Sequence, residues 1–449
     1  MMHVAFAGFE AVEAISLFIY VLSKKVIEKG QQHMSVRRTA LNQILMIHSY
    51  WHLCEDETSH YPCVMPVSTL RPKDPALKLL PMHHHHINIR TYTLAHKQPL
   101  TNLPFSTSHL GKSTMVDKIT PNDSRIKRLS ADLNGQTYAY IESSPSSTPI
   151  ATIFLIHGWP DLSFGWRYQI PFLTSLGYRV IAPDMMGYGG SSAPESSSFY
   201  TFKRAADDIA ALAKHIGVSQ IILGGHDWGG AIVYRVAIHY PELISALFSV
   251  CTPFFPPKKE LVSMSVASNF KYQIQLKGPD VEREIVGEKK LRQFLNAMYG
   301  GIGPNGEFGF SVGHGVFFEN LDKLRPSRMV SGEELDFYAK EYAKHGMHGP
   351  LNWYRTEELN FEDERGLVGK FEEGEGSFKF EIPTLFIASS RDDALPPKIS
   401  LGMDKYFKKL TRAEVDTSHW ALTEKPVEVN GHLKEWLEEV MGVSKKASL

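Results

Sequence analysis

The stretch GGHDWGG at residues 224–230 decides the fold of this chain. An apolar run at 220–223 precedes it, and a helical pattern at 231–239 follows it. This order predicts a buried strand, a sharp turn and a helix, which is the setting of a nucleophile elbow. Such an elbow needs small residues around its central nucleophile because that residue occupies a strained turn. Gly225 and Gly229 supply this frame around Asp227; an aspartate that only caps the helix is the alternative.

Apolar runs similar to 220–223 recur along the chain. They lie at 150–156, 179–183, 244–250 and 384–388, with a short one at 414–415. Continuous runs of this kind are typical of strands buried on both faces of a parallel sheet. The stretch 200–217 has apolar residues at helical spacing and ends at Gly217. Two alternating segments, 126–129 and 137–142, flank Asn134-Gly135 and predict a hairpin. We therefore predict an α/β fold with a mostly parallel, doubly wound sheet flanked by helices.

The region 256–380 does not continue this alternation. It is charged and helical in pattern, with glycine-rich breaks at 300–315 and 366–376. We predict that it is an inserted helical cap, which divides the core domain into residues 115–255 and 381–449. Ligands of such sheets bind outside the carboxyl ends of the strands, so the cap would cover the pocket.

Residues 1–114 have a different composition and contain 11 of the 20 histidines. They show little periodicity, and we predict a poorly ordered extension. The segment 4–22 is apolar apart from Glu10 and Glu13. Because two carboxylates inside a membrane span are costly, we expect an amphipathic surface helix, with a membrane anchor as the alternative. The histidine tract 83–86 has no carboxylate or cysteine partners close by, so we predict no metal site there.

Overall composition excludes several classes of protein. The chain has 449 residues, 43% of them hydrophobic, and a formal net charge of −1. It can therefore bury a core, and it has no broad electrostatic reason to bind nucleic acid. Its three cysteines cannot form a disulfide framework and indicate a reducing compartment, so we expect a cytoplasmic location. A membrane-associated or a peroxisomal location is the less favoured alternative, since the C-terminal Ala447-Ser448-Leu449 only faintly resembles a peroxisomal signal. No Cys/His spacing is typical of a zinc site, and the predicted chemistry needs no metal or organic cofactor.

An aspartate at the centre of the elbow restricts the reaction. A serine that attacked an alkyl carbon would leave an ether, which is not readily hydrolysed. A carboxylate leaves an ester, which water cleaves. Asp227 therefore predicts displacement at an sp³ carbon followed by ester hydrolysis, and it argues against a serine esterase or lipase.

Hydrolysis of that ester needs donors for an oxyanion and a base for water. The motif HGWP at 157–160 ends the run 150–156, so the backbone N–H groups of Trp159 and Trp228 are the expected donors. The base should be a late histidine, and His419 follows the last short strand. Its carboxylate partner should follow the strand at 384–388, where Asp392 is favoured and Asp393 stays open.

Four motifs carry a family resemblance: HGWP at 157–160, GHDWGG at 225–230, SRDDAL at 390–395 and TSHW at 417–420. On these motifs, residues 124–440 resemble the soluble-type epoxide hydrolases of the α/β-hydrolase fold. The resemblance implies a small-molecule epoxide as substrate, with His157, Gly158 and Pro160 at the substrate. It also implies that two cap tyrosines hold the epoxide oxygen. The strings NFKYQ at 269–273 and LNWYR at 351–355 assign this role to Tyr272 and Tyr354.

Two other functions remain open at this point. A haloalkane or haloacid dehalogenase of the same fold would also use an aspartate nucleophile, although the two cap tyrosines and Trp159 argue against it. A catalytically silent binding protein with the same pocket is the alternative from another class.

Overall fold

The computed structural model describes residues 116–372 and 376–442 of the chain. The predicted extension 1–114, its helix near 4–22 and its histidine tract lie outside the described residues. Within the described ranges, no helix combines the length and the apolar character needed to cross a membrane.

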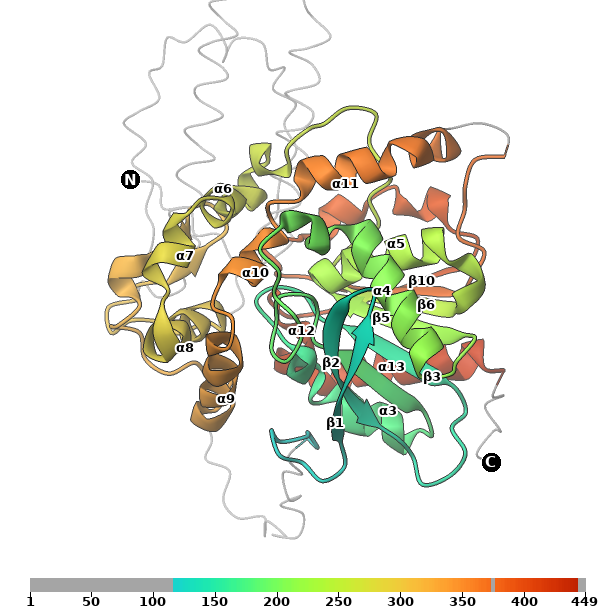
Figure 1. Ribbon diagram of the computed structural model, residues 1–449, viewed down its shortest axis with the longest axis horizontal. Coiled ribbons are helices and arrows are strands. Elements are labelled where there is room, and N and C mark those ends of the chain that lie inside the picture. The colour runs from blue at the N-terminus through green and yellow to red at the C-terminus, as the bar shows by residue number, and fades with distance from the viewer. Residues whose placement is uncertain (1–115, 373–375, 443–449) are drawn as a thin grey trace, which may run out of the picture. The chain divides into compact units, whose positions relative to one another are not determined.

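An eight-stranded sheet forms the centre of the described chain (Figure 1). Its order is β1-β2-β4-β3-β5-β6-β9-β10. β2 runs antiparallel to both of its neighbours, β1 and β4, and the six strands from β4 to β10 are parallel to one another. The mostly parallel α/β sheet predicted from the apolar runs is therefore confirmed. The strands are β1 (Lys127–Leu133), β2 (Gln136–Ser143), β3 (Thr152–Ile156), β4 (Arg179–Pro183), β5 (Ile221–His226), β6 (Ile244–Val250), β9 (Thr384–Ser389) and β10 (Leu410–Val415).

The predicted hairpin joins β1 to β2 at Asn134 and Gly135. Both residues have positive φ angles, 49° and 80°. A two-residue turn with this backbone matches the twist of the strands that it connects, and Asn-Gly is the pair that adopts it most readily.

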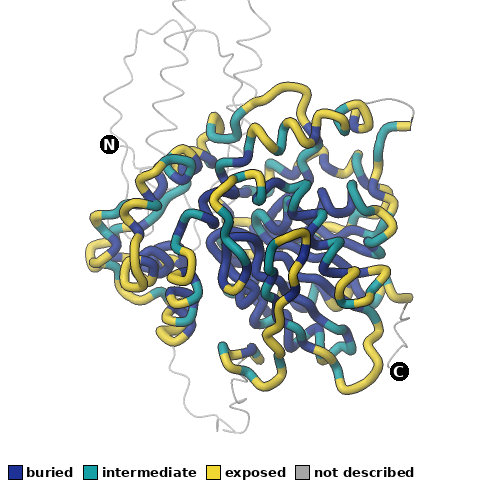
Figure 2. The backbone as a smooth tube through the Cα atoms, viewed as in Figure 1, coloured by how far each residue is buried: buried dark blue, intermediate teal, exposed yellow. Residues whose placement is uncertain are grey.

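Helices cover both faces of the sheet. On one face α4 (Phe202–His215) packs against α5 (Trp228–His239), and on the other α3 (Gln169–Ser175) packs against α13 (Pro426–Val440). The short α12 (Ala421–Glu424) precedes α13. The strands between these layers are the most deeply buried part of the described chain (Figure 2). All residues of β3, β5 and β9 are buried, which explains their continuous apolar sequences.

A long insertion separates β6 from β9, although these two strands pair directly. Its helices are α6 (Tyr272–Lys277), α7 (Asp280–Glu284), α8 (Gly287–Met298), α9 (Gly332–Ala343), α10 (His348–Asn352) and α11 (Glu357–Glu364). Helices α6 to α10 gather beside one end of the sheet (Figure 1), whereas α11 packs against the core helix α4. The extent of the cap as a domain stays a prediction.

Several local features differ from the sequence-based expectations. Helix α5 begins at Trp228, three residues earlier than expected, because the elbow turns directly into the helix. Strand β10 begins at Leu410 rather than near 414; it lies at the sheet edge and most of its residues are partly or fully exposed, so it has no apolar run. The glycine-rich break 300–315 contains most of a small hairpin of β7 (Phe310–Ser311) and β8 (Gly315–Val316).

Candidate active site

Asp227 occupies the turn between β5 and α5 with a φ of 54°. A non-glycine residue rarely adopts this left-handed conformation, which stores strain at a functional position. The neighbouring glycines allow it. A Cβ atom at Gly225 would overlap the carbonyl of Gly229, and one at Gly229 would overlap the carbonyl of Ile156. The elbow predicted from the spacing Gly225-x-Asp227-x-Gly229 is therefore present.

The two carboxylate oxygens of Asp227 have different surroundings. Oδ1 accepts a hydrogen bond from the backbone N–H of Trp159 at 2.7 Å. The backbone N–H of Trp228 also hydrogen bonds to the carboxylate. Oδ2 lies 3.5 Å from Nε2 of His419. The hydroxyl of Thr252 fixes the backbone by donating to the Asp227 carbonyl at 2.7 Å. The carboxylate is thus held by the two predicted donors, and its Oδ2 faces the predicted base.

His419 follows β10, and its ring is oriented by a buried carboxylate. Nδ1 of His419 lies 2.7 Å from Oδ2 of Asp392. Oδ1 of Asp392 accepts from the backbone N–H groups of Ala394 and Leu395 at 2.9 and 2.8 Å. The neighbouring Asp393 is exposed. The structure therefore brings Asp392, and not Asp393, to His419.

Burial and charge act in opposite directions on the three titratable groups. Burial lowers the pKa of His419, but the Asp392 and Asp227 carboxylates outweigh it and raise that pKa to about 9. Burial raises the pKa of Asp392, but the His419 charge and hydrogen bond, together with the Leu395 N–H, lower it overall. Burial is the main effect on Asp227 and raises its pKa, against the charge of His419 and the two backbone donors. His419 is thus held as an imidazolium between two carboxylates.

Two tyrosines from the inserted segment lie over the elbow. Tyr272 begins α6 and Tyr354 follows α10, and their ring centroids are 6.0 Å apart. Burial is the largest cause that raises the pKa of both phenols, and the charge of Asp227 acts in the same direction. Both therefore keep their protons and can donate hydrogen bonds.

Tyr354 is held edge-to-face by two indole rings. The Trp159 and Trp228 rings each lie 5.3 Å from the Tyr354 ring, at 89° and 74° to it. These are the same two residues whose backbone N–H groups bind Asp227. Trp159 and Trp228 therefore contact Tyr354 with their rings and hold Asp227 with their backbone N–H groups.

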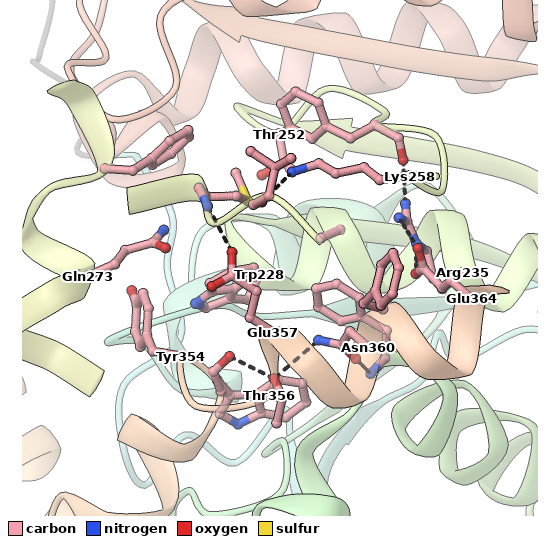
Figure 3. Close-up of a pocket in the computed structure, with 18 of the residues that line it drawn as sticks. Trp228, Arg235, Thr252, Lys258, Gln273, Tyr354, Thr356, Glu357, Asn360 and Glu364 are labelled. Carbon is pink, nitrogen blue, oxygen red and sulfur yellow. Dashed lines mark hydrogen bonds and ion pairs between the residues drawn. The ribbon is translucent and has the colours of Figure 1, made fainter. Parts of the chain in front are cut away.

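Two cavities meet at Asp227, Tyr272 and Tyr354, which line both of them. The first, shown in Figure 3, extends from Trp228 along α11 and towards Lys258. The second extends past Asp227, His419 and Asp392 towards β7. The first is lined mainly by apolar side chains, among them Phe202, Phe255, Pro256, Leu261, Val262, Met264, Phe270 and Phe361. The second is lined by Trp159, Pro160, Met298, Phe308, Phe310, Val312, His419 and Trp420, among others.

The expected substrate contacts in the HGWP motif are only partly present. Pro160 lines the second cavity. The expectation for His157 is wrong: its ring is buried, Nδ1 lies 2.8 Å from the Gly158 carbonyl, and Nε2 accepts from Met185 N–H at 2.9 Å. Both ring nitrogens hold the loop and neither faces a cavity. Gly158 lines neither cavity; instead it allows a close approach, because a Cβ there would lie 2.6 Å from Trp228 N.

Thr252 is a site residue that none of the sequence motifs indicates. It lies just after β6, lines the first cavity and holds the Asp227 carbonyl. Its position at the carboxyl end of a parallel strand, where ligands bind in such sheets, was the available signal.

Within the described ranges, one cluster has the residue types of a metal site. The ligand atoms of His226, Cys251 and His419 lie within 4.8 Å of one another. Nε2 of His226 donates to the His419 carbonyl at 2.9 Å, and Sγ of Cys251 lies 3.5 Å from the same oxygen. Burial raises the pKa of the Cys251 thiol well above its usual range. His226 and Cys251 therefore hold the backbone at His419, and the thiol of Cys251 stays protonated.

Comparison with known proteins places this site in a family. Residues 151–426 match the model of the alpha/beta hydrolase fold family. The epoxide hydrolase srdG of Neurospora crassa is 40% identical over 343 residues, which are 72% of this chain and 99% of that protein. Epoxide hydrolase A of Mycobacterium tuberculosis is 30% identical over 321 residues, 68% of this chain and 95% of its own length. Bifunctional epoxide hydrolase 2 of Mus musculus is 34% identical over 295 residues, which are only 51% of that longer protein.

Solved structures agree with these relatives. Epoxide hydrolase A from Mycobacterium thermoresistibile is 29% identical with a TM-score of 0.58, and the match covers 70% of this chain and 98% of that one. An epoxide hydrolase from Vigna radiata is 26% identical with a TM-score of 0.59, with 70% and 98% covered. The chain therefore belongs to the epoxide hydrolases of the α/β-hydrolase fold.

Proposed function

We propose that this protein converts an epoxide and water into a vicinal diol through a covalent alkyl ester on Asp227. One observation carries the proposal: a single carboxylate lies between two backbone donors, a base and two protonated phenols. The names of its relatives support the same reaction.

In the first half-reaction, Oδ2 of Asp227 attacks one epoxide carbon from the side opposite the oxygen. Tyr272 and Tyr354 hold that oxygen, and one phenol gives it a proton as the carbon–oxygen bond breaks. An alkoxide is thereby avoided, and a hydroxyalkyl ester of Asp227 remains. The two cavities that meet here would receive the substituents of the two epoxide carbons.

Once Asp227 has become an ester, the His419 imidazolium has lost the charge of one of its two carboxylates and gives its proton to the phenolate left by the first half-reaction. In the second half-reaction, Nε2 of the neutral His419 then takes a proton from water, and the resulting hydroxide attacks the ester carbonyl at Asp227. Asp392 holds the imidazole and stabilises the imidazolium that forms. The N–H groups of Trp159 and Trp228, which already hydrogen bond to the carboxylate of Asp227, bind the tetrahedral oxyanion. The diol leaves, the carboxylate is restored, and His419 keeps the proton taken from water, as at the start of the cycle. No step needs a metal or an organic cofactor.

The inserted segment between β6 and β9 supplies both phenols and most of the first cavity wall. It therefore acts as a cap that positions the epoxide and excludes water. The catalytic groups all come from residues after 150, so the predicted extension 1–114 has no part in the proposed chemistry.

The test compares wild-type protein with Asp227→Asn and Tyr354→Phe on a panel of aryl and alkyl epoxides. We expect diol from the wild type, a loss of at least about 1000-fold in freshly prepared Asp227→Asn, and about 100-fold slower ester formation in Tyr354→Phe. Halide release from matched haloalkanes is measured in parallel. Halide release without diol formation would favour a dehalogenase, and full activity of fresh Asp227→Asn would exclude the proposed nucleophile.

A further inference from the structure

The indole N–H of Trp228 is a buried donor without a use in the mechanism above. Within the part of the chain that the structure describes, Nε1 of Trp228 is buried and makes no hydrogen bond of normal length and angle. Its ring lines the first cavity beside Tyr354, as Figure 3 shows. Such a weakly paired donor at a reacting centre gains most from an acceptor that becomes stronger during the reaction.

We propose that the indole N–H of Trp228 stabilises the phenolate of Tyr354 while the epoxide opens. In that step the bond from Asp227 to carbon forms, the carbon–oxygen bond breaks, and the Tyr354 proton moves to the epoxide oxygen. The phenol oxygen is then an anion and a much stronger acceptor than the neutral phenol. Trp228 is thus a positioning residue that acts through Tyr354, and the inference rests on the proposed function.

The geometry supports an effect on Tyr354 in particular. The two rings are 5.3 Å apart at 74°, and Phe202 packs on Trp228 at 5.8 Å. Burial raises the pKa of Tyr354 most, whereas a weak hydrogen bond from the Trp228 side chain acts in the opposite direction and favours the phenolate. A contact that strengthens only as charge develops lowers the barrier without tightening substrate binding.

Trp159 provides a matched control. Its indole lies at the same 5.3 Å from Tyr354, and its Nε1 is also buried without an acceptor. Its side chain is not among the main influences on the pKa of Tyr354. Changing either tryptophan to phenylalanine removes one indole N–H but keeps an aromatic ring and the backbone donor to Asp227.

The experiment measures single-turnover ester formation at saturating epoxide, using the full chain and rapid quenching. We expect Trp228→Phe to slow ester formation at least tenfold, to leave ester hydrolysis within threefold, and to raise the pKa of Tyr354 in an ultraviolet phenolate titration. Trp159→Phe should slow ester formation clearly less than Trp228→Phe does. In a double-mutant cycle, Trp228→Phe should have no further effect once Tyr354 is phenylalanine, but its full effect once Tyr272 is phenylalanine.

The inference is overturned if Trp228→Phe slows ester formation equally with and without the Tyr354 hydroxyl, or if both tryptophan variants behave alike. If Trp228→Phe does not fold, Trp228→His, which keeps a ring N–H, is tested in the same cycle and must again be coupled to Tyr354. A wild-type protein that forms neither ester nor diol would instead exclude the proposed function itself.

Discussion

Nε2 of His419 lies 3.5 Å from Oδ2 of Asp227, whereas the Trp159 N–H binds the other oxygen, Oδ1. The base therefore faces the nucleophile directly before any substrate binds. Once Asp227 has become an ester, the same position lets His419 deliver a hydroxide to the ester carbonyl.

Removal of the base should separate the two half-reactions. His419→Gln keeps a polar side chain near Asp227 but cannot accept a proton from water. We expect normal or moderately slowed ester formation and ester hydrolysis slowed about 100- to 10,000-fold. Mass spectrometry of the intact protein should then show stoichiometric alkylation after mixing with epoxide. An alkylated fraction no larger than that of the wild type would contradict the assignment of His419.

The two adjacent acidic residues, Asp392 and Asp393, give a matched pair of variants. Asp392 hydrogen bonds to His419, whereas Asp393 is exposed. Asp392→Asn should lower the pKa of His419 and slow ester hydrolysis at least about 100-fold, because the imidazolium loses its buried partner. Asp393→Asn should stay within threefold of the wild type. The measurement is turnover at saturating substrate, and equal losses in the two variants would contradict the assignment.

The pKa of His419, about 9 in the free protein, should fall when the ester forms. Esterification removes the charge of Asp227, one of the two carboxylates that raise it. The rate of ester hydrolysis should therefore rise with pH along a limb whose midpoint lies below the pKa of His419 measured by NMR in the free protein. Coincidence of the two values would show that Asp227 has no influence on the base.

The same raised pKa affects stability. His419 binds its proton more tightly in the folded protein than in the unfolded chain, where its pKa is about 6.5. The stabilisation that this difference gives the folded state is therefore complete below about pH 6.5. It is lost as pH rises through about 9. The free energy of unfolding, measured in urea, should decline over this window, and His419→Gln should reduce that decline. An unchanged slope in the variant would assign the decline to other groups.

Gly158→Ala should impair catalysis more than folding. A Cβ at this position would lie 2.5 Å from the Asp227 Cβ and 2.6 Å from Trp228 N, so the elbow or the donor loop must shift. A displacement of about 1 Å costs roughly 100-fold in rate. Gly431→Ala, in the middle of α13 with open space around it, is the control and should stabilise the protein by about 0.5–1 kcal/mol. Activity assays and thermal unfolding distinguish the two effects.

The sequence predicted the parts of the fold and site whose local pattern is strong. Buried strands appear as continuous apolar runs, and the elbow appears as two glycines around Asp227, because in both cases the physical requirement is local. Strand β10 was mostly missed because it lies at an edge and is largely exposed. The strands of the β7–β8 hairpin have only two residues each, which is too short for an alternating pattern of apolar and polar residues to be recognised.

Side-chain direction was harder to predict than position in the chain. His157 lies in the expected loop, but its two ring nitrogens bind the backbone at Gly158 and Met185 instead of facing a cavity. The choice between Asp392 and Asp393 depends on which side chain turns inward, and the sequence left this open. Thr252 was missed because a threonine after a strand has no distinctive motif.

The direct pairing of β6 with β9 has a consequence for how such enzymes diversify. Val250 lies beside Ile387 in parallel register, so the long segment between them leaves the sheet and returns to it at neighbouring strands. A different segment could be exchanged there without altering the register of any strand. Provided that it carries counterparts of Tyr272 and Tyr354, the choice of substrate is free to diverge while the ester-forming and ester-cleaving groups stay where the sheet places them.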